Sequence, residues 1–327
     1  MNPASPRPAR SIMVLYTGGT IGMQASANGL APASGFEQRM RAELSTRSDL
    51  APWRFLEMTP LIDSANMTPA YWLRLRAAIV DAVDAGCDAV LVLHGTDTLA
   101  YSAAAMSFQL LGLPAPVLFT GSMLPAGAEH SDAWENLGGA LQALTAGQPA
   151  EVQLYFHGQL LPPRRTAKVR SFGRNPFVAL QRSALPANAS PLPAALDYRQ
   201  PQQPVDIAVL PLVPGISADL LRAVIHSGAQ GLILECFGSG TGPSDDPDFI
   251  HALEQAHSRD LVVVAITQCH EGGVEFDIYE AGSRLRQTGV VSAGGMTREA
   301  AFGKLQWLLG SGLAVEDVRR LIELELV

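Results

Sequence analysis

Short apolar runs alternate with segments of helical periodicity along this chain. Residues 12–15 and Ala89–Leu93 are continuous stretches of aliphatic side chains. Runs of this length and composition predict strands that are buried on both faces of a parallel sheet. The same pattern predicts further strands at residues 116–120, Val152–Phe156, 207–212, Gly231–Cys236 and 261–267.

Helical periodicity fills the intervals between these strands. The clearest helix runs from residue 69 to about residue 85, because Thr68 suits the cap position, Pro69 suits the first turn and Gly86 suits the end. A second helix is predicted over residues 99–111, where several alanines allow close packing on a sheet. The remaining predicted helices cover residues 217–227 and, as the last one, residues 299–309, starting near Thr297.

This alternation predicts two open α/β domains. The larger, N-terminal domain is expected over residues 1–182 and the smaller, C-terminal domain over residues 206–327. Residues 183–205 are rich in Pro, Ala and Gln and lack periodicity, so we expect them to form a linker. A length of 327 residues fits two domains, although one large barrel is also compatible with it.

Composition and charge narrow the classes of function. The chain is 47% hydrophobic and carries a net charge of −8, with no run of Lys or Arg, so nucleic acid is not expected as a partner. No apolar stretch reaches the roughly 20 residues of a membrane span. Residues 1–10 lack the apolar core of a signal peptide.

Cysteine and histidine spacing argues against a metal centre. The three cysteines, Cys87, Cys236 and Cys269, form no CxxC pair, and the seven histidines show no HxH or HExxH spacing. This cysteine usage suits the reducing cytoplasm. Residues 238–242 are rich in glycine but do not fit GxGxxG, so we expect a tight loop, and a nucleotide-dependent Rossmann enzyme is a poor interpretation.

The first two predicted strands each end in a turn that contains threonine. Ligands of open α/β sheets bind at this edge, so hydroxyl groups placed here suggest nucleophilic catalysis. In the first turn, Gly18 and Gly19 allow a sharp bend and expose the hydroxyl of Thr20. The alternative is that Thr17 and Thr20 only cap the next segment.

The second turn, residues 94–98, opens a helix, so free N–H groups face the same edge. Thr96 could attack a substrate or position a water, and Asp97 could bind a substrate ammonium group. The alternative is that Asp97 and Thr98 are ordinary helix caps. His94 is expected to be a packed, hydrogen-bonded residue at the strand end, not a base.

A hydroxyl nucleophile needs a base, and Lys168 is a candidate. A lysine removed from water can accept a proton from a hydroxyl, whereas a nearby Asp97 would favour its charged form. The alternative is that Lys168 is a solvated surface charge. Residues 24–35, small and polar, lie beside Thr20 and form either a mobile lid or a plain surface loop.

Together, these motifs resemble those of bacterial L-asparaginases, most closely the type I, cytoplasmic group. The matching segments occur in family order and span most of the chain. They are residues 16–23 (YTGGTIGM), 63–64 (DS), 67–69 (MTP), 93–98 (LHGTDT), 120–122 (TGS), Lys168, 214–219 (PGISAD) and 267–269 (TQC).

The resemblance implies hydrolysis of asparagine to aspartate and ammonia without a cofactor, in a cytoplasmic homo-oligomer, a dimer or tetramer, whose active sites lie at dimer interfaces. It implies that Thr20 is the nucleophile that attacks the side-chain amide. It implies that Thr96 is a second reactive hydroxyl, which activates or orients the water, with Lys168 as its base. It implies that Asp97 holds the substrate ammonium and that Asp63 and Ser64 hold its amino and carboxylate groups. Backbone N–H groups near Thr96, Gly121 and Ser122 would stabilise the oxyanion.

Two positions depart from the family pattern. Leu30 stands where family members usually carry the tyrosine of the lid, and Tyr16 does not obviously replace it. This leaves open a slower enzyme, a different small amide, another route to activating Thr20, or an amino-acid-binding or sensing protein with reduced or lost turnover. An amidotransferase subunit acting on charged tRNA is disfavoured, because the chain lacks a basic run and an additional N-terminal domain.

The second departure concerns the allosteric asparagine site of some type I enzymes. Cys269 is retained there, but Ala167 and Glu235 replace a threonine and an arginine. A carboxylate in place of a cation would repel the carboxylate of asparagine. We therefore expect no asparagine allostery of that kind.

Overall fold

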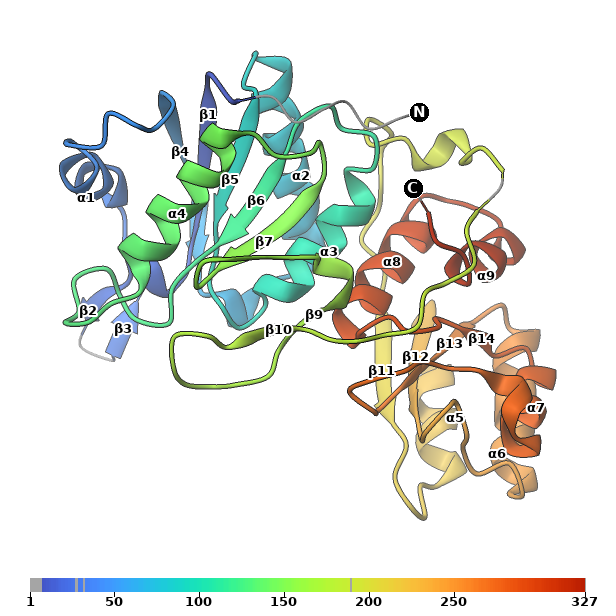
Figure 1. The fold of residues 1–327 in the computed structure, drawn as a ribbon. Coiled ribbons are helices and arrows are strands. Elements are labelled where there is room, and N and C mark those ends of the chain that lie inside the picture. The colour runs from blue at the N-terminus through green and yellow to red at the C-terminus, as the bar shows by residue number, and fades with distance from the viewer. Residues whose placement is uncertain (1–7, 27–28, 32, 189, 327) are drawn as a thin grey trace. The chain divides into compact units, whose positions relative to one another are not determined.

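The structure is a computed structural model that describes residues 8–26, 29–31, 33–188 and 190–326. The chain divides into two compact units, Met1–Ala179 and Leu180–Val327, each built around its own parallel or mainly parallel sheet (Figure 1). The predicted two-part α/β architecture is confirmed. The second unit includes residues 183–205, the segment for which the sequence predicts a linker, and a short 3₁₀ helix, Ala194–Leu196, interrupts that segment.

The first unit contains a six-stranded sheet in the order β4-β1-β5-β6-β7-β8. Five strands are parallel and β8 is antiparallel to β7. The strands are β1 (Ile12–Gly18), β4 (Trp53–Ile62), β5 (Ala89–Leu93), β6 (Val117–Thr120), β7 (Val152–Phe156) and β8 (Gln159–Leu161). The sequence did not predict β4, because it is an edge strand whose side chains are mostly half-buried or exposed.

Helices cover both faces of this sheet. Side chains of α1 (Phe36–Glu43) and α4 (Ala133–Ala146) share one apolar core with β1 and β5. On the other face lie α2 (Pro69–Asp84) and α3 (Leu99–Gln109) (Figure 1). The predicted start of α2 is confirmed, since the Thr68 hydroxyl accepts from the Tyr71 N–H at 3.2 Å and Pro69 is the first helical residue.

Strand order places a topological switch point in this sheet. The chain passes from β1 to β4 on one side and then returns to β5 on the other side of β1. Loops that leave β1 and β5 therefore diverge in opposite directions and open a crevice at the carboxyl edge of the sheet. Both threonine-containing turns of the sequence leave the sheet at this point.

Two hairpins border the same part of the first unit. One consists of β2 (Gln24–Ser26) and β3 (Gly29–Ala31), so the segment expected as a lid or plain loop contains antiparallel pairing. Its residues 27, 28 and 32 lie outside the described residues. The other hairpin consists of β9 (Thr166–Lys168) and β10 (Phe177–Ala179) and carries Lys168.

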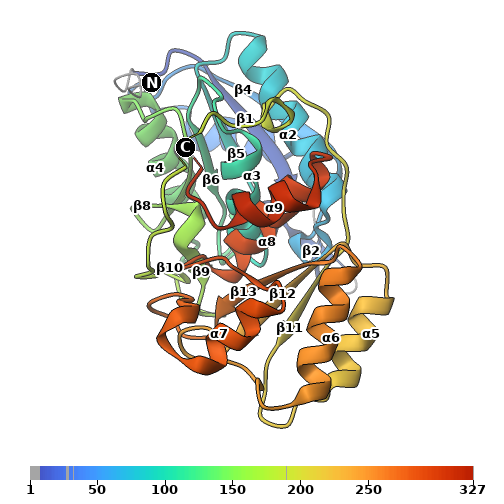
Figure 2. The same cartoon turned by 90° about the vertical axis from the view of Figure 1, so that its right-hand side faces the viewer.

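The second unit has four parallel strands whose spatial order follows the sequence, β11-β12-β13-β14. These are β11 (Ile207–Pro211), β12 (Gly231–Cys236), β13 (Val262–Thr267) and β14 (Val291–Ser292). Three helices on one face share its apolar core: α5 (Ala218–His226), α6 (Pro247–Ser258) and α7 (Glu280–Gln287) (Figure 2). Helices α8 (Arg298–Gly310) and α9 (Val315–Ile322) cover the other face.

The helix prediction at the C-terminus was incomplete. Helix α8, capped by Thr297, corresponds to the last predicted helix, but α9 follows it with only eight residues. The sequence also missed α1, α4, α6 and α7. The tight loop expected at residues 238–242 is confirmed, because Phe237 and Thr241 exchange backbone hydrogen bonds of 2.9 Å across it. Over the described parts of the chain, none of the helices has the length and apolar character needed to cross a membrane.

Candidate active site

The turns that follow β1 and β5 meet through their backbones. A Cβ atom on Gly19 would lie only 2.3 Å from the Gly95 nitrogen, and one on Gly95 would lie 2.5 Å from Ser64 Oγ. Only glycine allows such close approach, and Gly19 also has a positive φ of 82°. The turns after β1, β4 and β5 therefore converge on one place, as the sequence predicts for residues at this edge.

Neither threonine of the first turn caps a helix through its side chain. The Thr17 hydroxyl is buried and donates to the Leu93 carbonyl at 3.0 Å, which ties the ends of β1 and β5 together. Thr20 begins the 3₁₀ helix Thr20–Gly22 and is half-buried. Its hydroxyl hydrogen-bonds no residue that the structure describes. Thr20 thus offers a free hydroxyl at the carboxyl edge of the sheet.

Lys168 connects the second turn to the β9–β10 hairpin. Its Nζ lies 3.0 Å from Thr96 Oγ1 and 2.7 Å from Asp97 Oδ1. Only 17% of the Lys168 side chain is exposed, so it is not a solvated surface charge. A neutral amine at this distance can accept the proton of the Thr96 hydroxyl, whereas the ammonium form donates to the hydroxyl oxygen.

The helix-cap interpretation of Asp97 and Thr98 is wrong. Thr98 occupies the cap position of α3, but its side chain makes no cap hydrogen bond and instead donates to the Ser64 carbonyl at 2.8 Å. The Asp97 carboxylate turns to Lys168 and remains 63% exposed. Thr98 therefore ties its turn to Ser64, and the exposed Asp97 carboxylate remains available to a ligand cation.

Residues 63 and 64 lie beside these turns, after β4. The Asp63 carboxylate accepts from the Ala65 N–H at 3.2 Å and caps the 3₁₀ helix Ser64–Asn66. Ser64 is buried against Gly95. Their position at the C-terminal end of β4 groups them with Thr96 and Asp97.

The turn after β6 contributes Gly121 and Ser122. A Cβ atom on Gly121 would lie 2.2 Å from the His94 carbonyl oxygen, so this turn also packs directly on the second threonine turn. The Ser122 hydroxyl is buried and donates to the Leu124 carbonyl at 2.5 Å. Ser122 can therefore offer a ligand its backbone N–H, but its hydroxyl is already engaged.

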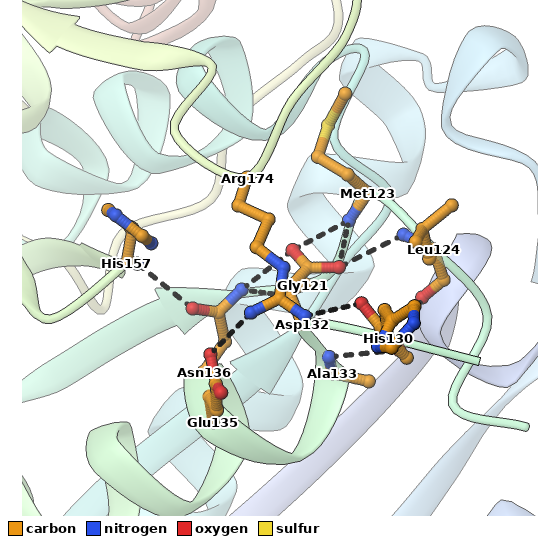
Figure 3. Close-up of polar contacts among 11 residues, drawn as sticks. Gly121, Met123, Leu124, His130, Asp132, Ala133, Glu135, Asn136, His157 and Arg174 are labelled. Carbon is orange, nitrogen blue, oxygen red and sulfur yellow. Dashed lines mark hydrogen bonds and ion pairs between the residues drawn. The ribbon is translucent and has the colours of Figure 1, made fainter. Parts of the chain in front are cut away.

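Sequence reasoning missed two residues that hold this turn, Asp132 and Asn136. Both are almost fully buried and bond to the backbone of residues 121–124 (Figure 3). The available signal was an Asp before a helical segment, which resembles an ordinary cap. Nothing in the local sequence shows which distant backbone it contacts.

His94 is a buried, hydrogen-bonded residue at the strand end, as expected. Its Nδ1 lies 2.7 Å from the Gly95 carbonyl oxygen, and its Nε2 is buried without a partner among the described residues. Burial lowers the pKa of His94 to about 4, so the imidazole is neutral near pH 7. It is enclosed by protein and cannot reach a substrate.

Tyr16 does not take the place of the lid tyrosine that Leu30 replaces. Leu30 lies on β3 and is exposed. The Tyr16 ring is buried, its hydroxyl donates to the Ala33 carbonyl at 3.3 Å, and burial raises the pKa of its phenol to about 12. Tyr16 packs against Gly22, so its hydroxyl is committed to the base of the hairpin.

In the second unit, Glu235 lies at the C-terminal end of β12. Its carboxylate is buried and accepts from Arg298, with Nη2 and Oε2 2.8 Å apart. Among the described residues, no group of three His, Cys, Asp or Glu side chains is arranged to hold a metal ion.

Two family models match the chain over most of its length. The model for the N-terminal domain of asparaginase matches residues 11–190, and the one for the C-terminal domain of glutaminase and asparaginase matches residues 206–322. The chain belongs to the asparaginase family. The family resemblance drawn from the threonine turns, the lysine and the later motifs is confirmed.

Proteins named L-asparaginase align with nearly the whole of this chain. L-asparaginase 1 of Escherichia coli K12 is 37% identical over 95% of each chain. The structure of L-asparaginase I from Vibrio cholerae superimposes with a TM-score of 0.81 at 33% identity, over 97% of this chain and 99% of that one. The thermostable L-asparaginase of Thermococcus kodakarensis gives a TM-score of 0.80 at 30% identity, over 97% of this chain and all of that one. These matches support the type I assignment.

Proposed function

We propose that this protein hydrolyses L-asparagine to L-aspartate and ammonia, with Thr20 as the nucleophile. The observation that carries the proposal is the contact of Lys168 with Thr96 and Asp97, on a turn packed against the turn of Thr20. Full-length similarity to enzymes named L-asparaginase supports asparagine as the substrate.

In this proposal the charged side chains select an α-amino acid. The exposed Asp97 carboxylate pairs with the substrate ammonium, and Asp63 with Ser64 binds the amino and carboxylate groups. Lys168 partly neutralises Asp97, which prevents the site from repelling the substrate carboxylate. Recognition of both charges fixes the side-chain amide beside Thr20.

Thr20 Oγ then attacks the carbonyl carbon of the side-chain amide. The developing oxyanion is stabilised by backbone N–H groups near Thr96, Gly121 and Ser122. The proton of the Thr20 hydroxyl is transferred to the amide nitrogen, which leaves as ammonia and gives an aspartyl ester of Thr20. Water held by Thr96 and Lys168 attacks this ester. As the ester C–O bond breaks, one proton of the water passes to Thr20 Oγ, and the other is released to solvent when the new carboxyl group ionises to aspartate.

We further propose a cytoplasmic homo-oligomer, a dimer or tetramer, with no nucleic-acid or membrane partner. The three cysteines are free thiols, which suits a reducing compartment. Several large apolar side chains of the first unit are exposed, among them Leu30, Leu124 and Phe172, with 75% of Phe172 accessible. Exposed apolar groups of this size favour coverage by a second copy.

Ammonia release from L-asparagine, L-glutamine and D-asparagine tests the proposed function. We expect wild type to act on L-asparagine and Thr20→Ala and Thr96→Ala each to lose about 10³-fold or more in kcat. The matched control is Thr267→Ala in the second unit, whose hydroxyl donates to the Gly238 carbonyl and should not affect kcat. Wild type that binds L-aspartate by calorimetry but releases no ammonia would instead be a binding protein, and Leu30→Tyr would then test whether the missing tyrosine is the cause.

A further inference from the structure

The carboxylate of Asp132 stands at the cap position of α4 but does not cap this helix. An Asp at this position normally accepts from the first N–H groups of its own helix. Here the Ser131 hydroxyl accepts from the Ala133 N–H at 3.1 Å instead. The Asp132 carboxylate accepts from the Met123 N–H, at 3.0 and 2.9 Å, and from the Leu124 N–H at 3.0 Å (Figure 3).

Asn136, one helical turn further on, secures the other end of the same turn. Its Nδ2 donates to the Gly121 carbonyl at 3.0 Å and to Asp132 Oδ2 at 3.1 Å. Its Oδ1 accepts from the His157 N–H at 2.9 Å, so both polar atoms of its side chain are used. Residues 121–124 are therefore held at the Gly121 carbonyl and at two N–H groups by one pair of buried side chains.

Two strained residues belong to the same network. His130 and His157 have φ values of 56° and 48°, and only one other non-glycine residue of the described chain has a positive φ. The His157 N–H donates to Asn136, and the His130 carbonyl accepts from Arg174 at 2.6 Å. Such conformations persist where surrounding contacts over-determine them, which indicates that this region is held in one arrangement.

Asp132 is 1% exposed and forms no ion pair with any described residue. The nearby Arg174 pairs with Glu135 instead. Its charge is balanced by N–H donors and by the positive end of α4. Burying a carboxylate in this way costs free energy that an apolar contact would not. A satisfied buried network of this kind gives the turn a unique geometry.

We propose that Asp132 and Asn136 are positioning residues that aim the peptide groups of Gly121 and Ser122 at the oxygen of the scissile amide. This inference rests on the proposed asparaginase function. The donors matter most when negative charge develops on that oxygen, so their displacement should lower kcat more than it raises KM. A shift of about 1 Å in such a group can cost on the order of 10²-fold in rate.

The test compares Asp132→Asn and Asn136→Leu with wild type, each with the same number of side-chain heavy atoms as the residue it replaces. Asp132→Asn sets an NH2 group against N–H donors, and Asn136→Leu removes the bond to the Gly121 carbonyl. We expect kcat for L-asparagine to fall about 10- to 100-fold, with KM and the Kd of L-aspartate changed by less than about 3-fold. Kinetics are measured below the unfolding transition of each variant.

The matched control is Asp246→Asn in the second unit. Asp246 does cap its helix, accepting from the Asp248 N–H at 2.9 Å and the Phe249 N–H at 3.3 Å, and asparagine is an equally good cap. This variant should keep wild-type kcat and KM.

Folded Asp132→Asn and Asn136→Leu with kcat within 2-fold of wild type would overturn the inference. A fall in kcat that matches the loss of folded protein would also overturn it. If one variant does not fold, the other decides. Wild type without ammonia release would refute the proposed function itself, which is a separate outcome.

Discussion

The two units of this protein contain the same kind of sheet but differ in the order of its strands. In the first, β1 lies between β4 and β5, and the chain reverses direction across the sheet. In the second, β11 to β14 follow one another in sequence order, so no reversal occurs. The candidate site lies in the first unit, at the reversal, where loops diverge and leave room for a ligand.

The difference in strand order can be seen in the hydrogen bonds of the threonines that lie at strand ends in the two units. Thr20 and Thr96 follow the two strands that flank the reversal, and they present a free hydroxyl and a hydroxyl bonded to Lys168. Thr267 ends β13 in the other sheet, where its hydroxyl donates to the Gly238 carbonyl and accepts from the Cys269 N–H at 3.0 Å. In the proposed function, a threonine that follows a strand takes part in the reaction only in the first unit, where the strand order reverses.

The largest effects are expected from replacing two lysines, Lys168 in the first unit and Lys304 in the second. The first replacement should lower activity and the second should lower stability. Lys168→Met should lower kcat/KM about 10³-fold, because Thr96 loses the amine that is hydrogen-bonded to its hydroxyl. The free energy of unfolding should change by less than about 1 kcal/mol, since Asp97, which loses its ion-pair partner, is exposed to water. Ammonia release and chemical denaturation measure the two quantities.

Lys304 provides the opposite case. It is fully buried in α8, and its Nζ donates to the carbonyls of Ile322 and Leu324 at 2.8 and 2.5 Å. Lys304→Met should destabilise the fold by about 3 kcal/mol, because these carbonyls lose their buried donor. The folded fraction should keep wild-type kcat. A Lys304 variant that loses kcat while folded, or a Lys168 variant that keeps it, would break the contrast between the units.

The next effect concerns His94, whose burial lowers its pKa to about 4 from an ordinary value near 6.5. Between these values the unfolded chain binds a proton that the folded chain does not, so stability falls as pH drops from about 6.5 to 4. The loss should reach about 3 kcal/mol. Denaturation of wild type and His94→Gln across this range measures it. Parallel stability curves for the two proteins would show that His94 is not responsible.

The smallest effect is expected at Glu235 in the second unit. Glu235→Gln weakens the contact with Arg298, and because half of the Arg298 side chain is exposed, stability should fall by only about 1 kcal/mol. Kinetics should remain hyperbolic in asparagine for wild type and variant alike. Sigmoidal wild-type kinetics that Cys269→Ala abolishes would refute the expected absence of allostery and assign the second unit a regulatory role.

The sequence predicted the buried strands well because their apolar runs are continuous, as in β5 and β13. It failed for β4, whose alternating exposure weakens the signal, and for the eight-residue α9. In the site, the strand-end turns and the need for a base pointed to Thr20, Thr96, Asp97 and Lys168, and the resemblance assigned their roles, which remain proposals. Asp132 could not be found, because its partners Met123 and Leu124 depend on how α4 packs and not on local spacing.

The contact between Gly19 and Gly95 limits how this protein can be re-engineered. A single methyl group on Gly19 would come within 2.4 Å of the Gly95 Cα, and that distance leaves no low-energy adjustment, since both contacting groups are main chain. A mutant library aimed at a new amide should therefore keep both glycines fixed and vary the exposed face of the β2–β3 hairpin, where Leu30 touches solvent and replacement meets little steric resistance. Substitutions are thus expected to be tolerated on the exposed face of the hairpin and not at Gly19 or Gly95.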